Sequence, residues 1–470
     1  MGVLELTGHP IQRTGAWAVA VLAGRDHPRD VDEGDLAAVR DGIVADLKTA
    51  ANAAKDSTEY GWWKVLFALY PNAAPTHASR AKWTDLDDRI EAIFASDEDL
   101  PGRTCVFCDL PAVVVWAKTY LPMFDTTKAL NTLPPAGDGW PVCRGCRIAM
   151  WALPYGALAG AGSTAVLTGG SDELQRRFVE HNVRGAKKVQ RRGLDGIVRG
   201  SAARLVVSKL FEVEELVEPI TLWTFKNDNQ EPWMSTVQGR TPLVRFVREL
   251  ENERQALLGW KMLANELTVR KRTGEVERYG SDRAAEALFE PTGKPQPHSR
   301  FLDTVYRRLS AGVEQKHPRT IDSLHALAYL YVREVLYMDP ERLRPVAELV
   351  ASWIAAGGAK GAGTNQRGRF NEYAKVALVP GDLGRKLVEA QTRLTLDGHP
   401  ISMQANDATD LICSGPDSGQ KRMLLFFLVI EELQKLDVKI GNKDKEQPPD
   451  DVETTVRAIR SGEGMMGGDS

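Results

Sequence analysis

Two short stretches of the chain, Thr104–Asp109 (TCVFCD) and Pro141–Arg147 (PVCRGCR), each carry two cysteines separated by two residues. A CxxC pair presents two thiolates from one tight turn, at the separation that a tetrahedral zinc ion requires. The two pairs together supply four sulfur ligands: Cys105, Cys108, Cys143 and Cys146. Four sulfurs leave no coordination position open, which is typical of structural rather than catalytic zinc sites. The pairs therefore predict a zinc module that joins distant segments of the chain.

Disulfide bonds and a redox CxxC motif are the alternative uses of these cysteines. Disulfides are disfavoured because the opening residues, MGVLELTGHP, lack the cationic and then apolar pattern of a secretory signal. A redox motif would need only one of the two pairs. No histidine lies between Cys105 and Cys146, so the sulfurs would hold the metal alone. The fifth cysteine, Cys413, has no partner in the sequence.

Length and composition limit the class of protein. A chain of 470 residues is long enough for two to four domains. Its formal charge of −3 excludes a globally basic nucleic-acid binder but leaves room for a local basic groove, because distant charges are screened. The longest strongly apolar run, Met423–Ile430, is too short to cross a bilayer. We expect a cytoplasmic protein that makes no membrane contact.

The pattern of apolar residues predicts a mixed, mainly α fold. An α+β N-terminal region would contain the inserted four-cysteine zinc module and would be followed by a C-terminal helical bundle. Apolar residues at helical spacing predict helices over 11–22, 35–52 and 61–70, and ITLWTF at 220–225 reads as a strand. The predicted boundaries are 1–100 (helical), 101–155 (zinc module), 156–290 (basic α+β region), 299–440 (helical bundle) and 441–470 (disordered tail).

A basic stretch from Arg176 to Arg204 is the best candidate for contact with nucleic acid. Arginine and lysine at this density bind phosphates through charge and forked hydrogen bonds. Too few acidic residues lie four positions away to neutralise the run. The residues that we expect to contact phosphate are Arg184, Lys187, Lys188, Arg191, Arg192 and Arg199. Glycines, beginning with Gly185, predict a surface of loops and short helices. The alternative is an ordinary solvated helix face.

Motifs of the common catalytic sites are missing from the sequence. It contains no GxxxxGK[ST] loop for nucleotide phosphates, no GxSxG nucleophile elbow and no HExxH metal motif. A zinc-supported HNH nuclease would need a histidine within the metal-framed segment, and that segment has none. We therefore expect a protein that is not an enzyme.

The opening TGHPIQRTG at 7–15, the two cysteine pairs and the apolar MWALPYG at 150–156 occur in an order that resembles a known family. They are similar to one branch of the large-subunit proteins of type I-B CRISPR Cascade complexes, which starts with a TGxP motif. The strand ITLWTFKNDNQEPW at 220–233 and the helical C-terminal half fit the same pattern. The resemblance spans most of the chain, although the C-terminal half matches only in character.

The resemblance implies a non-catalytic subunit of an RNA-guided antiviral complex. Such a subunit recognises the protospacer-adjacent motif in target duplex DNA, aids formation of the R-loop, holds displaced DNA and helps to dock a helicase-nuclease. Guide pairing reads most of the sequence, while the protein reads the short flanking motif and the shape of the duplex. The implied partners are CRISPR RNA, target double-stranded DNA, the Cascade backbone and RNA-end-binding subunits, and the recruited helicase-nuclease.

Three further expectations follow. We expect that the flanking motif is read by His9, Gln12 and Arg13. Related systems also make a small subunit from an internal start, and Met338 begins a C-terminal segment of suitable size. Two other classes stay open: a zinc-stabilised DNA-processing enzyme or toxin with an unrecognised active site, and a purely structural scaffold.

Overall fold

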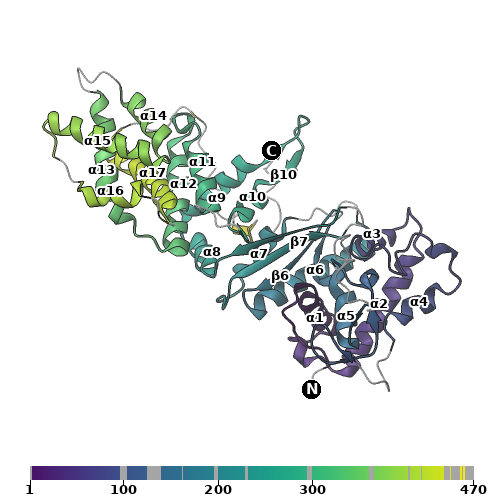
Figure 1. The fold of residues 1–470 in the computed structure, drawn as a ribbon. Helices are drawn as coiled ribbons and strands as arrows, with labels where there is room; N and C mark the ends of the chain where they lie inside the picture. Colours follow the sequence, from purple (N-terminus) through teal and green to yellow (C-terminus); the bar gives the residue numbers. More distant parts are fainter. Residues whose placement is uncertain are drawn as a thin grey trace. The chain divides into compact units, whose positions relative to one another are not determined.

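The computed structural model describes residues 3–95, 103–123, 139–160, 162–194, 200–227, 231–293, 299–358, 365–400, 403–413 and 417–438, with short pieces at 415, 445, 456–457 and 459–460. These residues form two compact units, Met1–Thr241 and Pro242–Ser470. Both units are built mainly from helices, with small sheets beside them, as Figure 1 shows. The expectation of a mainly helical chain with a small amount of sheet is confirmed.

The N-terminal unit begins with helices whose ends are encoded locally. In α1 (Pro10–Ala23), Pro10 opens the first turn and Gly24 ends the helix in the left-handed conformation, with φ of 70°. In α2 (Glu33–Ala51), Asp32 and Asp35 form a reciprocal capping box. The other helices of this unit are α3 (Tyr60–Leu69), α4 (Leu86–Ala92), α5 (Arg144–Gly156), α6 (Asp172–Arg192) and α7 (Ala202–Leu210). The helices predicted over 11–22, 35–52 and 61–70 are thus confirmed.

An antiparallel sheet lies beside these helices. Its strands within the N-terminal unit are β5 (Leu158–Ala159), β6 (Thr164–Gly169), β7 (Ile220–Lys226) and β8 (Trp233–Gly239), paired in the order β8-β7-β6-β5. The predicted strand at 220–225 is β7 and lies between β6 and β8. Figure 1 shows α1, α2, α5 and α6 gathered beside β6 and β7. Short pairs β1–β2 (Arg103–Thr104 and Pro111–Ala112) and β3–β4 (Val115–Trp116 and Trp140–Pro141) lie next to the cysteines.

The core of the N-terminal unit is built on α5. Its residues from Gly145 to Gly156 are buried, and α1 packs along it. The two helices approach so closely that a Cβ added to Gly15 would lie 1.9 Å from the carbonyl oxygen of Ala149. The ring of Tyr70 stacks on Trp151 of α5, with centroids 4.2 Å apart. This rigid packing fixes the start of α5, where the second cysteine pair lies.

The C-terminal unit consists of helices and one small hairpin. Its helices are α8 (Leu243–Asn252), α9 (Arg254–Leu267), α10 (Gly280–Ala287), α11 (Arg300–Ser310), α12 (Pro318–Tyr331), α13 (Arg344–Ala355), α14 (Gln366–Val376), α15 (Pro380–Leu396), α16 (Ala405–Ile412) and α17 (Ser418–Lys435). The hairpin strands are β9 (Val269–Arg270) and β10 (Val276–Arg278), and β11 covers Glu290–Pro291. The apolar run Met423–Ile430 lies in α17 and is buried, as expected of a core helix.

The division between the units differs from the one that the sequence suggested. The sequence suggested a boundary between 290 and 299, where the basic region ends and the helical bundle begins, whereas the two compact units divide between residues 241 and 242. The reason is that α9 packs on α12, α8 also contacts α12, and α10 contacts both α9 and α11. Residues 242–290 therefore share the core of the C-terminal unit. Most of the tail predicted at 441–470 lies outside the described residues.

Candidate metal centre and nucleic-acid interface

The first cysteine pair lies on the turn between β1 and β2. The backbone N–H of Cys105 donates to the carbonyl oxygen of Leu110 at 2.8 Å, which closes the turn. Asp109 takes the left-handed conformation with φ of 62°, a conformation that aspartate tolerates better than most residues. This tight turn brings the side chains of Cys105 and Cys108 to the same side.

The second cysteine pair lies at the start of α5. Cys143 is the N-cap residue of that helix and Cys146 lies in its first turn. The backbone N–H of Arg147 donates to the carbonyl oxygen of Cys143 at 2.9 Å. The N-terminal end of a helix carries a partial positive charge, which favours thiolates there. The two turns are tied together by the bond from Val106 N–H to the carbonyl oxygen of Pro141, at 3.1 Å.

The four sulfurs form one cluster. All lie within 4.8 Å of one another, and the Sγ atoms of Cys108 and Cys143 are 3.4 Å apart. A tetrahedral site with metal–sulfur bonds of about 2.3 Å would separate its sulfurs by roughly 3.8 Å. Cys108 is half-buried and the other three cysteines are buried. The donor set and its spacing therefore fit a closed, tetrahedral metal site, as the sequence predicted for these residues. Cys413 is exposed and is not part of the cluster.

The thiols perturb one another strongly. The hydrogen bond with Cys108 lowers the pKa of the Cys105 thiol, whereas bonds to Cys105 raise the pKa of Cys143 and of Cys146. The directions differ within the cluster: the pKa values of Cys105 and Cys108 are lowered, and ionisation of Cys143 and Cys146 is opposed. A metal cation at the centre would compensate for this effect, because a coordinating thiol is deprotonated.

Two of the three residues expected to read a DNA motif, His9 and Gln12, contact this cluster or the turn that carries it. Gln12 is completely buried, and its side-chain amide donates to the Sγ of Cys146 at 3.6 Å. The ring of His9 meets the ring of Phe107 edge-on, with centroids 5.0 Å apart, and burial lowers the pKa of His9 to about 4. Arg13 pairs with Asp172 at 3.1 Å. Because its side chain is enclosed, Gln12 cannot reach a base edge in this conformation, and sequence reasoning missed its contact with the cluster.

A row of cations lies along the second half of α6, which Ser171 caps at its N-terminus. Five exposed cations follow one another at intervals of three positions or one: Arg184, Lys187, Lys188, Arg191 and Arg192. None of the five forms an ion pair with a described residue. We call this group the α6 basic face. Arg199, the sixth residue predicted to contact phosphate, lies outside the described residues.

The rest of the basic stretch is used differently. Arg176 pairs with Glu180 at 3.0 Å, and Arg177 pairs with Glu173 at 2.8 Å. Arg204 is buried in α7, with 7% of its surface exposed. The expectation that Gly185 interrupts a surface of loops and short helices is wrong, since Gly185 lies inside one continuous helix of 21 residues. The unneutralised charge is therefore concentrated in the second half of α6.

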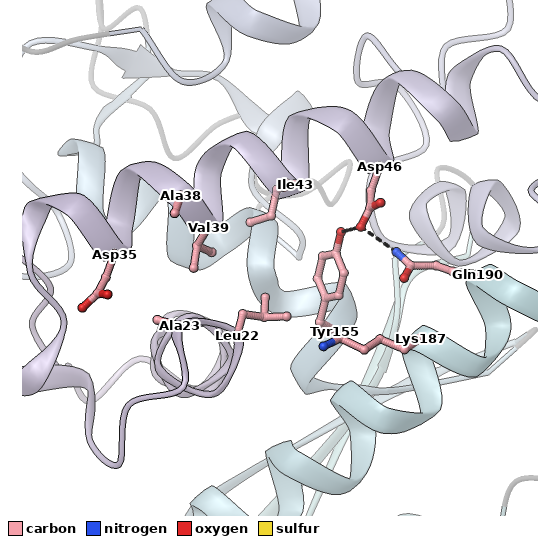
Figure 2. Close-up of a pocket in the computed structure, with 11 residues that line it drawn as sticks. Leu22, Ala23, Asp35, Ala38, Val39, Ile43, Asp46, Tyr155, Lys187 and Gln190 are labelled. Carbon is pink, nitrogen blue, oxygen red and sulfur yellow. Dashed lines mark hydrogen bonds between the residues drawn. The ribbon is translucent and has the colours of Figure 1, made fainter.

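A pocket of about 310 Å³ opens next to the α6 basic face (Figure 2). At one end, Asp46 accepts hydrogen bonds from the hydroxyl of Tyr155 at 2.6 Å and from the amide of Gln190 at 2.7 Å. Its walls include apolar residues such as Ile43, and the side chain of Lys187 runs toward Tyr155. Burial raises the pKa of Tyr155, so its hydroxyl stays a hydrogen-bond donor to Asp46. The sequence offered no signal for this pocket, because its polar residues come from three separate helices.

Comparisons with protein-family models, with curated proteins and with solved structures found no match to this chain. The resemblance to a Cascade large subunit therefore rests on the sequence motifs alone. Over the part of the chain that the structure describes, no helix is both long enough and apolar enough to cross a bilayer.

Proposed function

We propose that this protein is the non-catalytic large subunit of a type I CRISPR Cascade complex. In this role it recognises the protospacer-adjacent motif in target duplex DNA, aids R-loop formation and helps to dock the helicase-nuclease in antiviral defence. Its partners are CRISPR RNA, the Cascade backbone and the RNA-end-binding subunits. The proposal includes the finer layout expected from the sequence, a zinc module inserted in an α+β region ahead of a helical bundle.

The α6 basic face is the observation that carries this proposal. Its five cations span eight helical steps, which is about 12 Å of helix. Duplex DNA carries one negative charge per about 1.7 Å of its axis, so a face of this length can meet several phosphates at once. Contacts of this kind position a protein on a duplex without reading its bases. They suit a subunit that leaves most sequence reading to a guide RNA.

We further propose that the cysteine cluster holds a structural zinc ion. Tetrahedral sites with four sulfurs take zinc or iron. Elemental analysis of the purified protein should find about one zinc per chain and a colourless solution. Stoichiometric iron with visible absorption would assign the cluster to iron instead, and the absence of any metal would refute the site.

The test of the functional proposal is a pull-down of the tagged protein from its native cell. Copurified proteins are identified by mass spectrometry and bound RNA is sequenced. The proposal expects short RNAs that share one repeat-derived end, together with several backbone subunits. Recovery of the protein alone, without RNA, would overturn it.

The alternative, a DNA-processing enzyme or toxin with a zinc-stabilised fold, makes a different prediction. A closed four-sulfur site leaves no open position for a substrate. The purified protein should therefore leave DNA intact when magnesium or manganese is added. Metal-dependent cleavage that copurifies with the protein would favour the enzyme.

Internal translation from Met338 is part of the same proposal. The segment that starts there contains α13 to α17, in which α13 packs against the apolar α17. An immunoblot against a C-terminal tag should show a short product beside the full-length chain, and replacing Met338 by leucine should remove it. A blot with full-length protein only would argue against a separate small subunit.

A further inference from the structure

The side chain of Gln12 uses both ends of its amide at the edge of the metal centre. Its Nε2 donates to the carbonyl oxygen of Glu5 at 2.8 Å and to the Sγ of Cys146 at 3.6 Å. Its Oε1 accepts from the hydroxyl of Thr7 at 2.7 Å and from the backbone N–H of Thr7 at 3.2 Å. These four contacts fix the direction of the amide, so that an N–H group points at the sulfur. The residues that fix it, Glu5 and Thr7, precede α1.

Residues 3–9, which we call the N-terminal strap, also touch the cluster at other points. A Cβ added to Gly145, between the two cysteines of the second pair, would lie 2.3 Å from the carbonyl oxygen of Val3. Leu4 is buried, with 2% of its surface exposed. At the other end of the strap, His9 packs edge-on against Phe107, which lies between the cysteines of the first pair. The strap thus contacts both turns that carry the sulfur ligands.

We propose that Gln12 and the N-terminal strap form an outer shell of the metal centre, in which Gln12 is a positioning residue for Cys146. Metal binding and closure of the strap are then coupled. The proposal rests on the metal site and is independent of any role in DNA recognition. The proposal assigns the TGHPIQ segment the role of supporting the metal centre, and it explains why Gln12 is completely buried.

The physical basis is the stabilisation of a thiolate by an N–H donor. A hydrogen bond to an ionised acceptor is roughly twice as strong as one between neutral groups. Partners of this kind orient metal ligands, and their loss typically lowers metal affinity about 10–100-fold. The coupling is reciprocal: if strap closure strengthens metal binding, the metal must stabilise strap closure by the same factor.

The first test replaces Gln12 by leucine, which keeps the approximate size and removes the N–H donor. Cobalt(II), which fills tetrahedral sulfur sites and is coloured, is the probe. The variant should bind cobalt about 10–100-fold more weakly in a competition with a chelator. Its sulfur-to-cobalt absorption band should shift to longer wavelength, because the sulfur loses its hydrogen bond. A change that affected only folding would not move this band in the loaded protein.

Two control variants sharpen the test. Glu5→Gln changes an exposed side chain, and only the backbone carbonyl of Glu5 contacts Gln12. This variant should leave the cobalt affinity and the absorption band unchanged. Thr7→Val removes the hydroxyl that donates to the Oε1 of Gln12 but keeps the backbone N–H bond to the same oxygen and the N–H donor of Gln12 itself. It should have a smaller effect than Gln12→Leu. Unchanged affinity and an unshifted band in Gln12→Leu would overturn the proposal.

A second measurement needs no variant and decides the question if Gln12→Leu fails to fold. Hydrogen exchange of the native chain is compared with zinc bound and after removal of zinc by a chelator. The amides of residues 3–9 should exchange faster once the metal is gone. Equal protection of these amides in both states would show that the strap does not depend on the metal, and would overturn the proposal.

Discussion

At the scale of single residues, Gly15 decides how closely α1 can lie on α5. A methyl group at this position would lie 1.9 Å from the carbonyl oxygen of Ala149, a backbone atom that cannot rotate away. We expect Gly15→Ala to force the two helices apart and to destabilise the N-terminal unit by about 1–3 kcal/mol, the usual cost of overpacking. The measurement is the midpoint, by calorimetry, of the thermal transition that belongs to the N-terminal unit.

The matched control is Gly42→Ala in α2. A Cβ added there meets nothing within 4 Å, and alanine is favoured over glycine inside a helix by about 0.5–1 kcal/mol. This variant should be neutral or slightly stabilising. Equal destabilisation by both variants would show that the helix crossing does not explain the need for glycine at 15.

His325 in α12 should make the C-terminal unit sensitive to acid. Burial lowers its pKa from 6.5, and this effect exceeds the opposing ones of Glu431 and Asp322. The imidazole Nε2 lies 3.8 Å from a carboxylate oxygen of Glu431. Because the folded-state pKa is below the unfolded value, the unfolded chain binds the proton first as pH falls. The contribution to stability is complete above about pH 6.5 and declines below it, down to the folded-state pKa.

Urea unfolding at several pH values tests this prediction with His325→Gln as the reference, since glutamine does not titrate. The difference in unfolding free energy between the native chain and the variant should shrink as pH falls below 6.5. A difference that stays constant from pH 7.5 to 5 would contradict it.

The sequence predicted that Cys105, Cys108, Cys143 and Cys146 lie together, because the relation within each pair is local. Each cysteine pair lies within four residues, and the chemistry of one metal joins the two pairs whatever lies between them. The burial of Gln12 and Arg204 could not be predicted in this way. Both are polar residues whose partners or enclosure come from the tertiary structure, and a sequence pattern assigns such residues to the surface by default.

At the scale of elements, α6 combines two kinds of charged surface. Its first half carries arginines held by carboxylates of the same unit, and its second half carries the α6 basic face. If this face binds phosphates, changing Lys187, Lys188, Arg191 and Arg192 together to alanine should weaken binding to duplex DNA. The slope of log affinity against log salt should flatten by about 0.9 for each phosphate that the variant no longer neutralises. Fluorescence anisotropy over a salt series measures both quantities.

The first half of α6 supplies the control. Arg176 and Arg177 lie on the same helix but are paired with Glu180 and Glu173. Changing both to alanine removes cations that are already neutralised, so the salt slope should stay close to that of the native chain. A slope unchanged in the fourfold variant would remove the α6 basic face from the DNA interface.

Prediction of elements depended on how strong each local signal was. The β-branched and aromatic run of β7 was recognised, whereas β6 (TAVLTG) and β8 (WMSTVQG) were not. Both are stabilised as strands by pairing with β7, which a local pattern does not report. Gly185 lowers helix propensity at one position, but the buried residues of α6 on either side outweigh it.

At the scale of the whole molecule, each unit has a core of its own, and the cysteine cluster lies in the N-terminal unit. Two of the four cysteines lie at the start of α5, and α1 packs on this helix. Structural zinc sites contribute folding free energy directly, of the order of 10–16 kcal/mol in small zinc domains. If the cluster holds the proposed zinc, removing this metal should unfold or loosen the N-terminal unit and leave the C-terminal unit intact.

Calorimetry of the full chain with and without a zinc chelator tests this expectation. Two transitions are expected, since chains with two cores do not unfold in a single step. The chelator should lower the midpoint of one transition strongly, and hydrogen exchange should assign that transition to residues within 1–241. The transition of residues 242–470 should keep its midpoint. A single transition that shifts as a whole would mean that the two units unfold together. No shift at all would mean that the cysteines hold no structural metal.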